Sequence, residues 1–364
     1  MDRRAQGSNG GPPGPVVLKT ALTDRLGLTT PIVQGPMGAV SLPELSAAVS
    51  NAGGLGIIGL SWASPDEISS LIEKTRSLTP RPFGINLVLE WDQRERLARA
   101  LAAGVRVVSL SWGDPGPYLA MIREAGACAI LTVGSAQEAR AAVEAGIDVI
   151  LAQGVEAGGH VVGQVGTMVL VPAVVDAVAL ALEGTVAGAA RATPVIAAGG
   201  IADGRGLAAA LMLGAAGVCC GTRFLASEEA YAHADYKRRV LEARETDTCY
   251  SLLFDGGWPD APHRTLINRV VAEWMAAGRP VAGARPGEGA SIGRTGDGSP
   301  MMLYDDVSVT PDIDGDLEKL PLYAGQGAGL VSSIKPAGEI VAEMTAEAIA
   351  ALGVVGRRQP PAGS

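Results

Sequence analysis

One short segment joins a glycine turn to a histidine, and these residue types can bind a flat ligand and move a proton. Gly158, Gly159 and His160 follow the apolar run at 148–152, which is typical of a buried strand. Two adjacent glycines adopt backbone angles closed to other residues and let a ligand approach the main chain. An imidazole changes its charge near neutral pH. The segment predicts a cofactor site with a base beside it, whereas such a histidine taken alone is more often structural or solvent-facing.

Two more glycine turns follow apolar runs, and both can hold a phosphate group. Gly199 and Gly200 follow the run at 194–198, while Gly221 and Thr222 follow the run at 217–220. Each turn offers backbone N–H groups, and the Thr222 hydroxyl adds a further donor for a phosphate dianion. A tight turn alone would account for either glycine pair. The presence of both turns favours a phosphate site, because α/β barrels commonly hold phosphate after their last two strands.

Short β-branched runs alternate with longer Ala-rich amphipathic segments from residue 31 to about 245, which is typical of repeated βα units. Eight such units close into a (β/α)8 barrel, the TIM barrel. A doubly wound nucleotide-binding sheet lacks support, because no Gly-x-Gly-x-x-Gly follows the first run. We therefore expect a TIM barrel with strands at 31–34, 55–60, 83–87, 105–110, 129–133, 148–152, 194–198 and 217–220.

The pattern divides the chain into four parts. Residues 1–17 are rich in Gly and Pro and predict a mobile N-terminal tail, and residues 18–245 form the barrel. Residues 246–335 break the βα pattern, which predicts a lid or substrate-side insertion. Residues 336–352 predict a closing amphipathic helix packed on the barrel.

The composition and charge of the chain limit the classes of partner that it can bind. The net charge of −9 and pI near 5.0 oppose nucleic-acid binding. The longest apolar segment, 168–182, contains Pro172 and Asp176 and falls short of a membrane span of ~18 residues. The 4 cysteines show no metal-ligand spacing and no secretory signal precedes them, so we expect reduced thiols, no metal and a cytoplasmic protein. The partner expected is a small molecule, and a homo-oligomer is compatible with the sequence.

The order and spacing of six motifs resemble the nitronate monooxygenase family, also called the 2-nitropropane dioxygenase type, whose members are FMN-dependent barrels. The resemblance covers about 18–352, with motifs at 34–37, 83–87, 153–160, 197–201, 221–224 and 323–326. It implies bound FMN, with Pro36 and Met37 lining the flavin ring, Asn86 and Gln153 hydrogen-bonding it, Gly158 and Gly159 letting it approach, and Gly199, Gly200, Gly221 and Thr222 holding its phosphate.

The same resemblance implies an activity. His160 would be the catalytic base that removes the α-proton of a nitroalkane, or would position an anionic nitronate that needs no base. The flavin would pass the substrate's electrons to O2. Flavin-dependent enoyl-ACP reductases and NAD(P)H:quinone reductases would present a similar flavin site, and a non-catalytic flavin-binding barrel is a further alternative.

Three groups of residues outside the barrel motifs have open roles. In the segment 320–330, alternating glycines would let the main chain lie close to a ring system, with Gln326 meeting the flavin edge or the substrate; a flexible linker is the alternative. His263 lies at the start of the insertion, where it could reach the substrate. Trp62, Trp91 and Trp112 follow the second, third and fourth strands and either form a wall of the active site or shield loops.

Overall fold

The computed structural model describes residues 17–183 and 193–355, so the predicted tail at 1–17 lies almost wholly outside the described residues. Eight parallel strands form one sheet, and each coincides with a predicted strand within two residues. A bridge between Val33 and Leu55 joins the two edges, so the sheet closes and the predicted TIM barrel is confirmed. Around the sheet the order is β1 (Ile32–Gln34), β9 (Gly217–Cys220), β8 (Val195–Ala198), β6 (Val149–Gln153), β5 (Cys128–Val133), β4 (Val107–Ser111), β3 (Phe83–Val88) and β2 (Gly56–Gly59).

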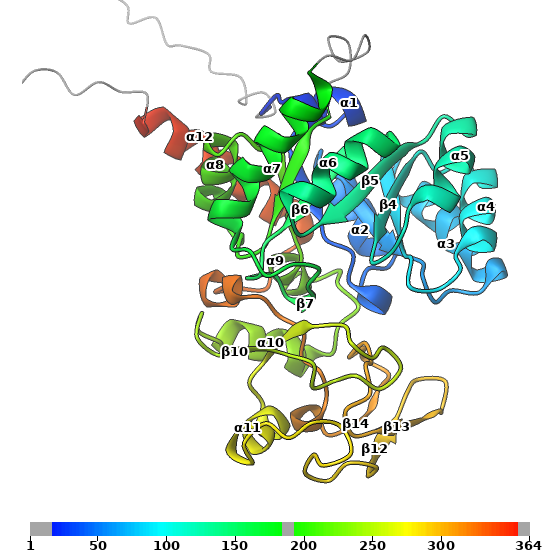
Figure 1. Cartoon of the computed structure of the whole chain (residues 1–364), viewed down its shortest axis with the longest axis vertical. Helices are drawn as coiled ribbons and strands as arrows, with labels where there is room; N and C mark the ends of the chain where they lie inside the picture. Colours follow the sequence, from blue (N-terminus) through cyan, green and yellow to red (C-terminus); the bar gives the residue numbers. More distant parts are fainter. Residues whose placement is uncertain (1–16, 184–192, 356–364) are drawn as a thin grey trace, which may run out of the picture.

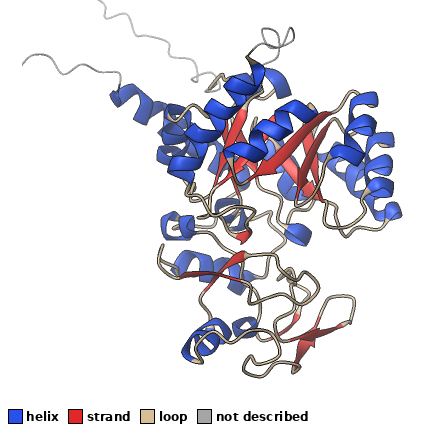
Figure 2. Ribbon diagram, viewed as in Figure 1, coloured by secondary structure: helices blue, strands red, loops and turns tan. Residues whose placement is uncertain are grey.

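Helices cover the outside of the barrel (Figures 1 and 2). Three of them start at a side-chain cap, and at the helix following β2 Ser64 and Glu67 form a reciprocal capping box. The helices between successive strands are α2 (Pro43–Asn51), α3 (Pro65–Leu78), α4 (Arg94–Ala102), α5 (Gly116–Glu124), α6 (Ala136–Ala145), α7 (Thr167–Leu182) and α8 (Gly204–Met212).

The eighth outer helix comes from the far end of the chain. After β9 only a short helix, α9 (Thr222–Leu225), follows directly, and the outer position between α8 and α2 is taken by α12 (Ala337–Val355). Glu347 of α12 accepts a hydrogen bond from the Gly204 N–H at 2.8 Å, and the Thr345 hydroxyl lies 2.7 Å from that of Thr30. The helix predicted at 336–352 is thus part of the barrel's outer layer.

The inside of the barrel is packed with aliphatic side chains, so the barrel is not a pore. Val33, Ile57, Val107 and Ile196 point inward with their neighbours, and α1 (Ala21–Leu26) closes the N-terminal end of the strands with Leu22. Cys219 belongs to this inner layer, where burial raises its thiol pKa to about 12. Any site must therefore open at the C-terminal ends of the strands.

The insertion contains more regular structure than its irregular sequence suggested. Figure 1 shows it, yellow to orange, beyond the C-terminal ends of the strands. One small sheet joins it to the barrel's His160 turn, because β11 (His263–Leu266) pairs with both β10 (Thr248–Ser251) and β7 (Gly159–His160). The remaining elements are α10 (Ala234–Glu242), which precedes it, α11 (Arg269–Ala276), β12 (Ser291–Arg294), β13 (Pro300–Met302), β14 (Asp314–Gly315) and the 3-10 turns η2 (Leu317–Lys319) and η3 (Gln326–Leu330); a further 3-10 turn, η1 (Gly38–Val40), follows β1.

Candidate active site

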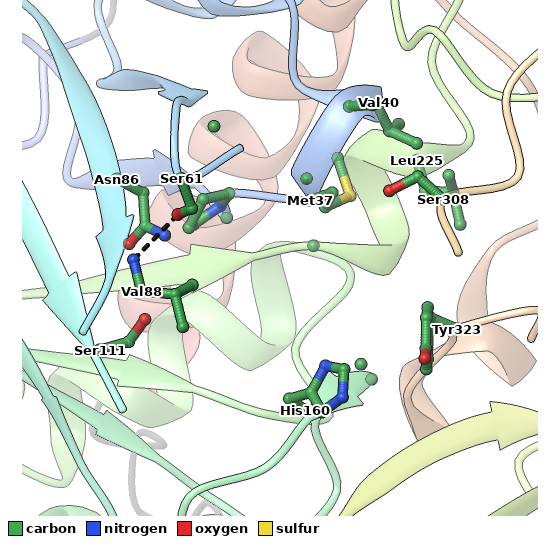
Figure 3. A pocket seen from close by; sticks show the side chains of 18 of the residues that line it. Met37, Val40, Ser61, Asn86, Val88, Ser111, His160, Leu225, Ser308 and Tyr323 are labelled. Atoms are coloured by element: carbon green, nitrogen blue, oxygen red, sulfur yellow. Dashed lines mark hydrogen bonds between the residues drawn. The ribbon is translucent and has the colours of Figure 1, made fainter. Parts of the chain in front are cut away.

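A cavity of about 990 Å³ lies at the C-terminal ends of the strands, between the barrel and the insertion. It is at the upper end of the ~300–1,000 Å³ typical of ligand pockets. Figure 3 shows Met37, Asn86, His160 and Tyr323 around it. The predicted site residues that line this cavity are Pro36, Met37, Asn86, Gln153, Gly158, Gly159, His160, Gly199, Gly200, Gly221 and Thr222.

Gln326 is the exception among the predicted residues. It lines a second, smaller cavity of about 510 Å³, which shares Gly199, Gly200, Ile201 and Gly327 with the first. The backbone N–H of Gln326 donates to the Glu156 carbonyl at 3.0 Å. Gln326 therefore lies on the smaller cavity, next to the glycine turn that follows β8, and does not line the main cavity.

Two contacts fix the turn that carries His160. The Gln153 side chain donates to the His160 carbonyl at 3.1 Å and accepts from the Val162 N–H at 2.9 Å. On the other side, β7 pairs with β11, so that His160 faces His263 in register. Both polar atoms of Gln153 thus bind the chain's own backbone, a positioning role that the sequence did not indicate.

The His160 ring is a buried, neutral imidazole. Its Nε2 is buried without a hydrogen-bond partner and lies 3.8 Å from Asp306 Oδ2. Burial, with a smaller contribution from nearby His263, lowers the His160 pKa to about 3. At physiological pH the ring therefore carries no charge, and it would accept a proton only where a neighbouring anion offsets the cost of burying the resulting charge.

Asp306 is a functional candidate that sequence reasoning missed. Its Oδ1 accepts a hydrogen bond from the Tyr323 hydroxyl at 2.6 Å, and its backbone N–H donates to the Gly256 carbonyl. Burial raises the Asp306 pKa to about 6, although the Tyr323 hydrogen bond lowers it. The available signal was an acidic pair, Asp305 and Asp306, set among the apolar residues at 301–304 and Val307.

His263 is a structural neighbour of His160. It is fully buried, with its ring centre 5.5 Å from that of His160. Its Nε2 accepts from the Phe254 N–H at 3.2 Å, so Nδ1 carries the proton and donates to the Ala261 carbonyl at 3.0 Å. Because both nitrogens are engaged and burial lowers its pKa to about 4, His263 is held neutral and does not act on a substrate.

The glycines of the site serve two different needs. Gly159, Gly199 and Gly200 have φ of 72°, 106° and 70°, angles that suit glycine. Gly158 is required by space instead, because a Cβ there would overlap the Gly325 backbone nitrogen. The segment around Gly325 is packed against the site, with Leu320, Leu322, Ala324 and Ala328 fully buried, and is not a flexible linker.

The cavity fits the flavin that the family resemblance implies. Asn86 lines the cavity, and its carboxamide oxygen is buried without a hydrogen-bond partner. This oxygen can therefore accept a hydrogen bond from a ligand bound in the cavity. The Thr222 hydroxyl already accepts from the Gly325 N–H at 3.0 Å, which leaves its own proton free to donate. Among the described residues, the charged side chains lining the cavity are Asp66, Glu67 and Asp306, with no Lys or Arg.

These features define a barrel with a large cavity, lined by a buried histidine, at the C-terminal ends of its strands. The chain belongs to the nitronate monooxygenase family, whose sequence model matches residues 19–96 and 90–347, and it is an oxidoreductase. It is 35% identical over 362 residues to (3aS,4S,5R,7aS)-5-hydroxy-7a-methyl-1-oxo-octahydro-1H-indene-4-carboxyl-CoA dehydrogenase of Mycobacterium tuberculosis, covering 91% of this chain and 96% of that protein.

Two solved structures are similar over almost their whole length. FabK from Thermotoga maritima superposes with a TM-score of 0.75 at 34% identity, covering 93% of this chain and 98% of that one. Nitroalkane oxidase from Streptomyces ansochromogenes superposes with a TM-score of 0.73 at 30% identity, covering 93% and 100%. Among the described residues, no helix is both long enough and apolar enough to cross a membrane, and no group of three or more potential metal ligands occurs.

Proposed function

We propose that this protein is an FMN-dependent oxidoreductase that oxidises nitroalkanes and alkyl nitronates with O2. The observation that carries the proposal is the neutral, buried imidazole of His160 beside the Asp306 carboxylate, on a cavity that three glycine turns also line. A nitroalkane is a carbon acid, so its oxidation begins with the removal of an α-proton by a base. The family match and the likeness to a nitroalkane oxidase support the same reading.

The chain offers a complete set of residues for FMN. Met37 and Pro36 would contact the flavin ring, and the Asn86 carboxamide would accept a hydrogen bond from it. The turns at 199–200 and 221–222 would hold the phosphate through backbone N–H groups and the Thr222 hydroxyl, because no cationic side chain lines the described cavity. When bound, FMN supplies the redox chemistry by accepting the substrate's electrons and passing them to O2.

His160 would take the proton and Asp306 would stabilise the charge that results. With Asp306 ionised, the proton of neutral His160 is favoured on Nε2, which faces the carboxylate, and Nδ1 is left as the basic atom. When Nδ1 accepts a proton, the imidazolium forms 3.8 Å from the carboxylate, a distance that can shorten as substrate binds. The Tyr323 hydrogen bond holds Asp306 in place for this role.

The charge of the cavity favours neutral nitroalkanes over nitronate anions as the form that binds. The charged lining residues among those described are all acidic, and the neutral His160 ring carries no positive charge to attract an anion. The negative charge of a nitronate would therefore be stabilised only by the bound cofactor and by backbone N–H groups. We expect a lower KM for a neutral nitroalkane than for its nitronate.

We predict that the protein binds FMN as its cofactor. The purified protein should be yellow, and heat denaturation should release FMN rather than FAD, because the two glycine turns suit one terminal phosphate and no dinucleotide fingerprint is present. Chromatography of the released flavin against both standards measures this. Released FAD, or no flavin after reconstitution with FMN, would remove the basis of the proposal.

Asp306→Asn should lower kcat/KM for nitroethane about 10- to 100-fold, the value of a charged hydrogen bond expressed as a rate. The pH profile should change as well. Below about pH 6 Asp306 is protonated and cannot stabilise the imidazolium, so the wild-type rate should fall with falling pH. This acidic limb of the pH–rate profile should be absent from the variant. Steady-state rates between pH 5 and 8 test it.

Asp305→Asn is the matched control for this variant. The Asp305 side chain accepts from the Met302 N–H at 2.7 Å and does not line the cavity. Its charge contributes to raising the Asp306 pKa, so this variant should keep the limb and move it to lower pH. If the limb survives in Asp306→Asn, another group titrates and Asp306 has no role in proton transfer.

A second candidate function is dehydrogenation of an acyl-CoA thioester, favoured by the 35% identity to a carboxyl-CoA dehydrogenase over almost the whole chain. A thioester is also a carbon acid, so His160 could play the same part. Anaerobic mixing of the FMN-loaded protein with ethylnitronate, octanoyl-CoA and NADH, each separately, distinguishes the candidates by which compound bleaches the flavin. Bleaching by NADH alone would instead favour an enoyl-ACP or quinone reductase.

A further inference from the structure

Four of the chain's five tryptophans meet at one side of the cavity. Trp62 lies 5.8 Å from Trp91 between ring centres, Trp91 5.1 Å from Trp258, and Trp258 5.2 Å from Trp112, all edge to face. We call these four residues the tryptophan wall. Three come from the loops after β2, β3 and β4, and Trp258 comes from the insertion. Trp258, Trp91 and Trp112 pack with Val88 and Ala261 in a small hydrophobic cluster, yet all four tryptophans also line the cavity and Trp62 is largely exposed, so packing alone does not explain the group.

The tryptophan wall adjoins the proposed base. The Trp258 ring stacks on His160 with 4.0 Å between ring centres and 26° between planes, and the Trp112 ring meets His160 edge-on at 6.0 Å. At the other end of the wall, the Trp62 side of the cavity is open, and Trp62 is 56% exposed. A molecule whose reacting carbon lies at His160 would therefore extend along the indoles toward solvent.

The backbone is held in a costly conformation at one point of the wall. Trp112 has φ of 58°, in the left-handed region that bulky residues rarely adopt. The next residue, Gly113, has φ of 147°, and a Cβ there would lie 2.8 Å from Leu89. Strain of this kind is concentrated at functional sites, where surrounding structure compensates for it. Here it directs the indole to the cavity beside His160.

We propose that the tryptophan wall is a binding subsite for a neutral, apolar ring, and that the preferred substrates are carbon acids bearing a cyclic hydrocarbon rather than short-chain nitroalkanes. Indole rings bind other rings through stacked and edge-to-face contacts and bury large apolar areas. The described lining has no Lys or Arg for an anionic group, and the binding experiment below separates a neutral ring from a cation, which the acidic residues of the lining would attract. The substrate class rests on the proposed function, whereas the subsite itself does not.

Binding is measured apart from turnover with 1-indanone, a neutral bicyclic ketone, by calorimetry on the FMN-loaded protein. We expect 1-indanone to bind at least about tenfold more tightly than 2-butanone, since only the ring can cover the indoles. Trp62→Ala should weaken binding of 1-indanone roughly tenfold, and Trp62→Phe should retain most of it. Tighter binding of tetraethylammonium than of 1-indanone would overturn the proposal in favour of a cation site.

Trp274→Phe is the matched control, because Trp274 lies in α11, packs against Arg279 and does not line the cavity. It should bind 1-indanone as the wild type does. Equal binding of 1-indanone by Trp62→Ala and Trp274→Phe would show that the tryptophans only shield loops.

Kinetics then test the substrate class with two secondary nitroalkanes that lose a similar proton, nitrocyclohexane and 2-nitropropane. The wild-type KM should be about tenfold lower for nitrocyclohexane, and this ratio should approach one in Trp62→Ala. Wall-dependent binding of 1-indanone without turnover of either nitroalkane would refute the proposed function and leave the subsite standing. Turnover of both with equal KM values, and 1-indanone binding indifferent to Trp62, would refute the subsite alone.

Discussion

His160→Asn is expected to lower kcat/KM for nitroethane by about 10²- to 10⁴-fold, the usual contribution of a general base. Asparagine removes the ring that stacks on Trp258 but keeps a polar side chain, and the turn and FMN binding should change little because the turn is held through the backbone of residue 160. The loss for ethylnitronate should be much smaller, because the anion has already lost its α-proton. Parallel assays with the two substrates, with flavin content measured for each preparation, give the result.

His233→Asn is the matched control for this substitution. His233 caps α10 by accepting from the Asp235 N–H at 3.1 Å, lies outside the cavity lining, and asparagine is itself a good N-cap. This variant should keep the wild-type rates with both substrates. Equal losses with nitroethane and ethylnitronate in His160→Asn would mean that His160 positions the substrate and does not remove its proton.

The barrel could be predicted because its signals are local. Each strand is a short apolar run buried on both faces, and several of the intervening helices end at a glycine such as Gly146, which adopts φ of 93° as a left-handed cap. Once eight such units close, the C-terminal ends of the strands must meet. This geometry alone brings Asn86, His160 and Thr222 to one cavity, although they are widely separated in sequence.

The contacts made by the insertion could not be predicted in the same way. Asp306 and Trp258 both meet the His160 ring although they lie far from it in sequence, and β11 of the same insertion pairs with β7. That pairing depends on tertiary packing, since a two-residue strand such as β7 has no sequence pattern of its own. The sequence could not predict that Gln326 lines the smaller cavity next to the turn after β8, and the reason is the same. Alternating glycines indicate that the main chain packs closely against something, but they do not indicate against which residues.

The partner of those glycines can be named from the structure. Gly325 lies with φ of −83°, which any residue can adopt, so space alone demands glycine there. A Cβ at Gly325 would lie 2.5 Å from the Glu156 carbonyl oxygen and 2.8 Å from the Gly158 nitrogen, and backbone atoms cannot rotate away. The same residue donates its N–H to the Thr222 hydroxyl at 3.0 Å. Gly325 therefore ties the insertion to two turns proposed to hold FMN.

Gly325→Val should accordingly push the 320–330 segment away from the turn at Gly158, destabilising the protein by about 1–3 kcal/mol, as overpacking does. FMN should bind severalfold more weakly, because Thr222 loses the partner that orients its hydroxyl. Gly338→Ala is the control. Gly338 lies in α12, and a Cβ there would contact only the Ala52 Cβ, at an ordinary van der Waals distance of 3.8 Å. Titration of the apoproteins with FMN, followed by flavin fluorescence, measures the effect. If Gly325→Val binds FMN and turns over nitroethane like Gly338→Ala, the segment only tethers α12 and has no part in the site.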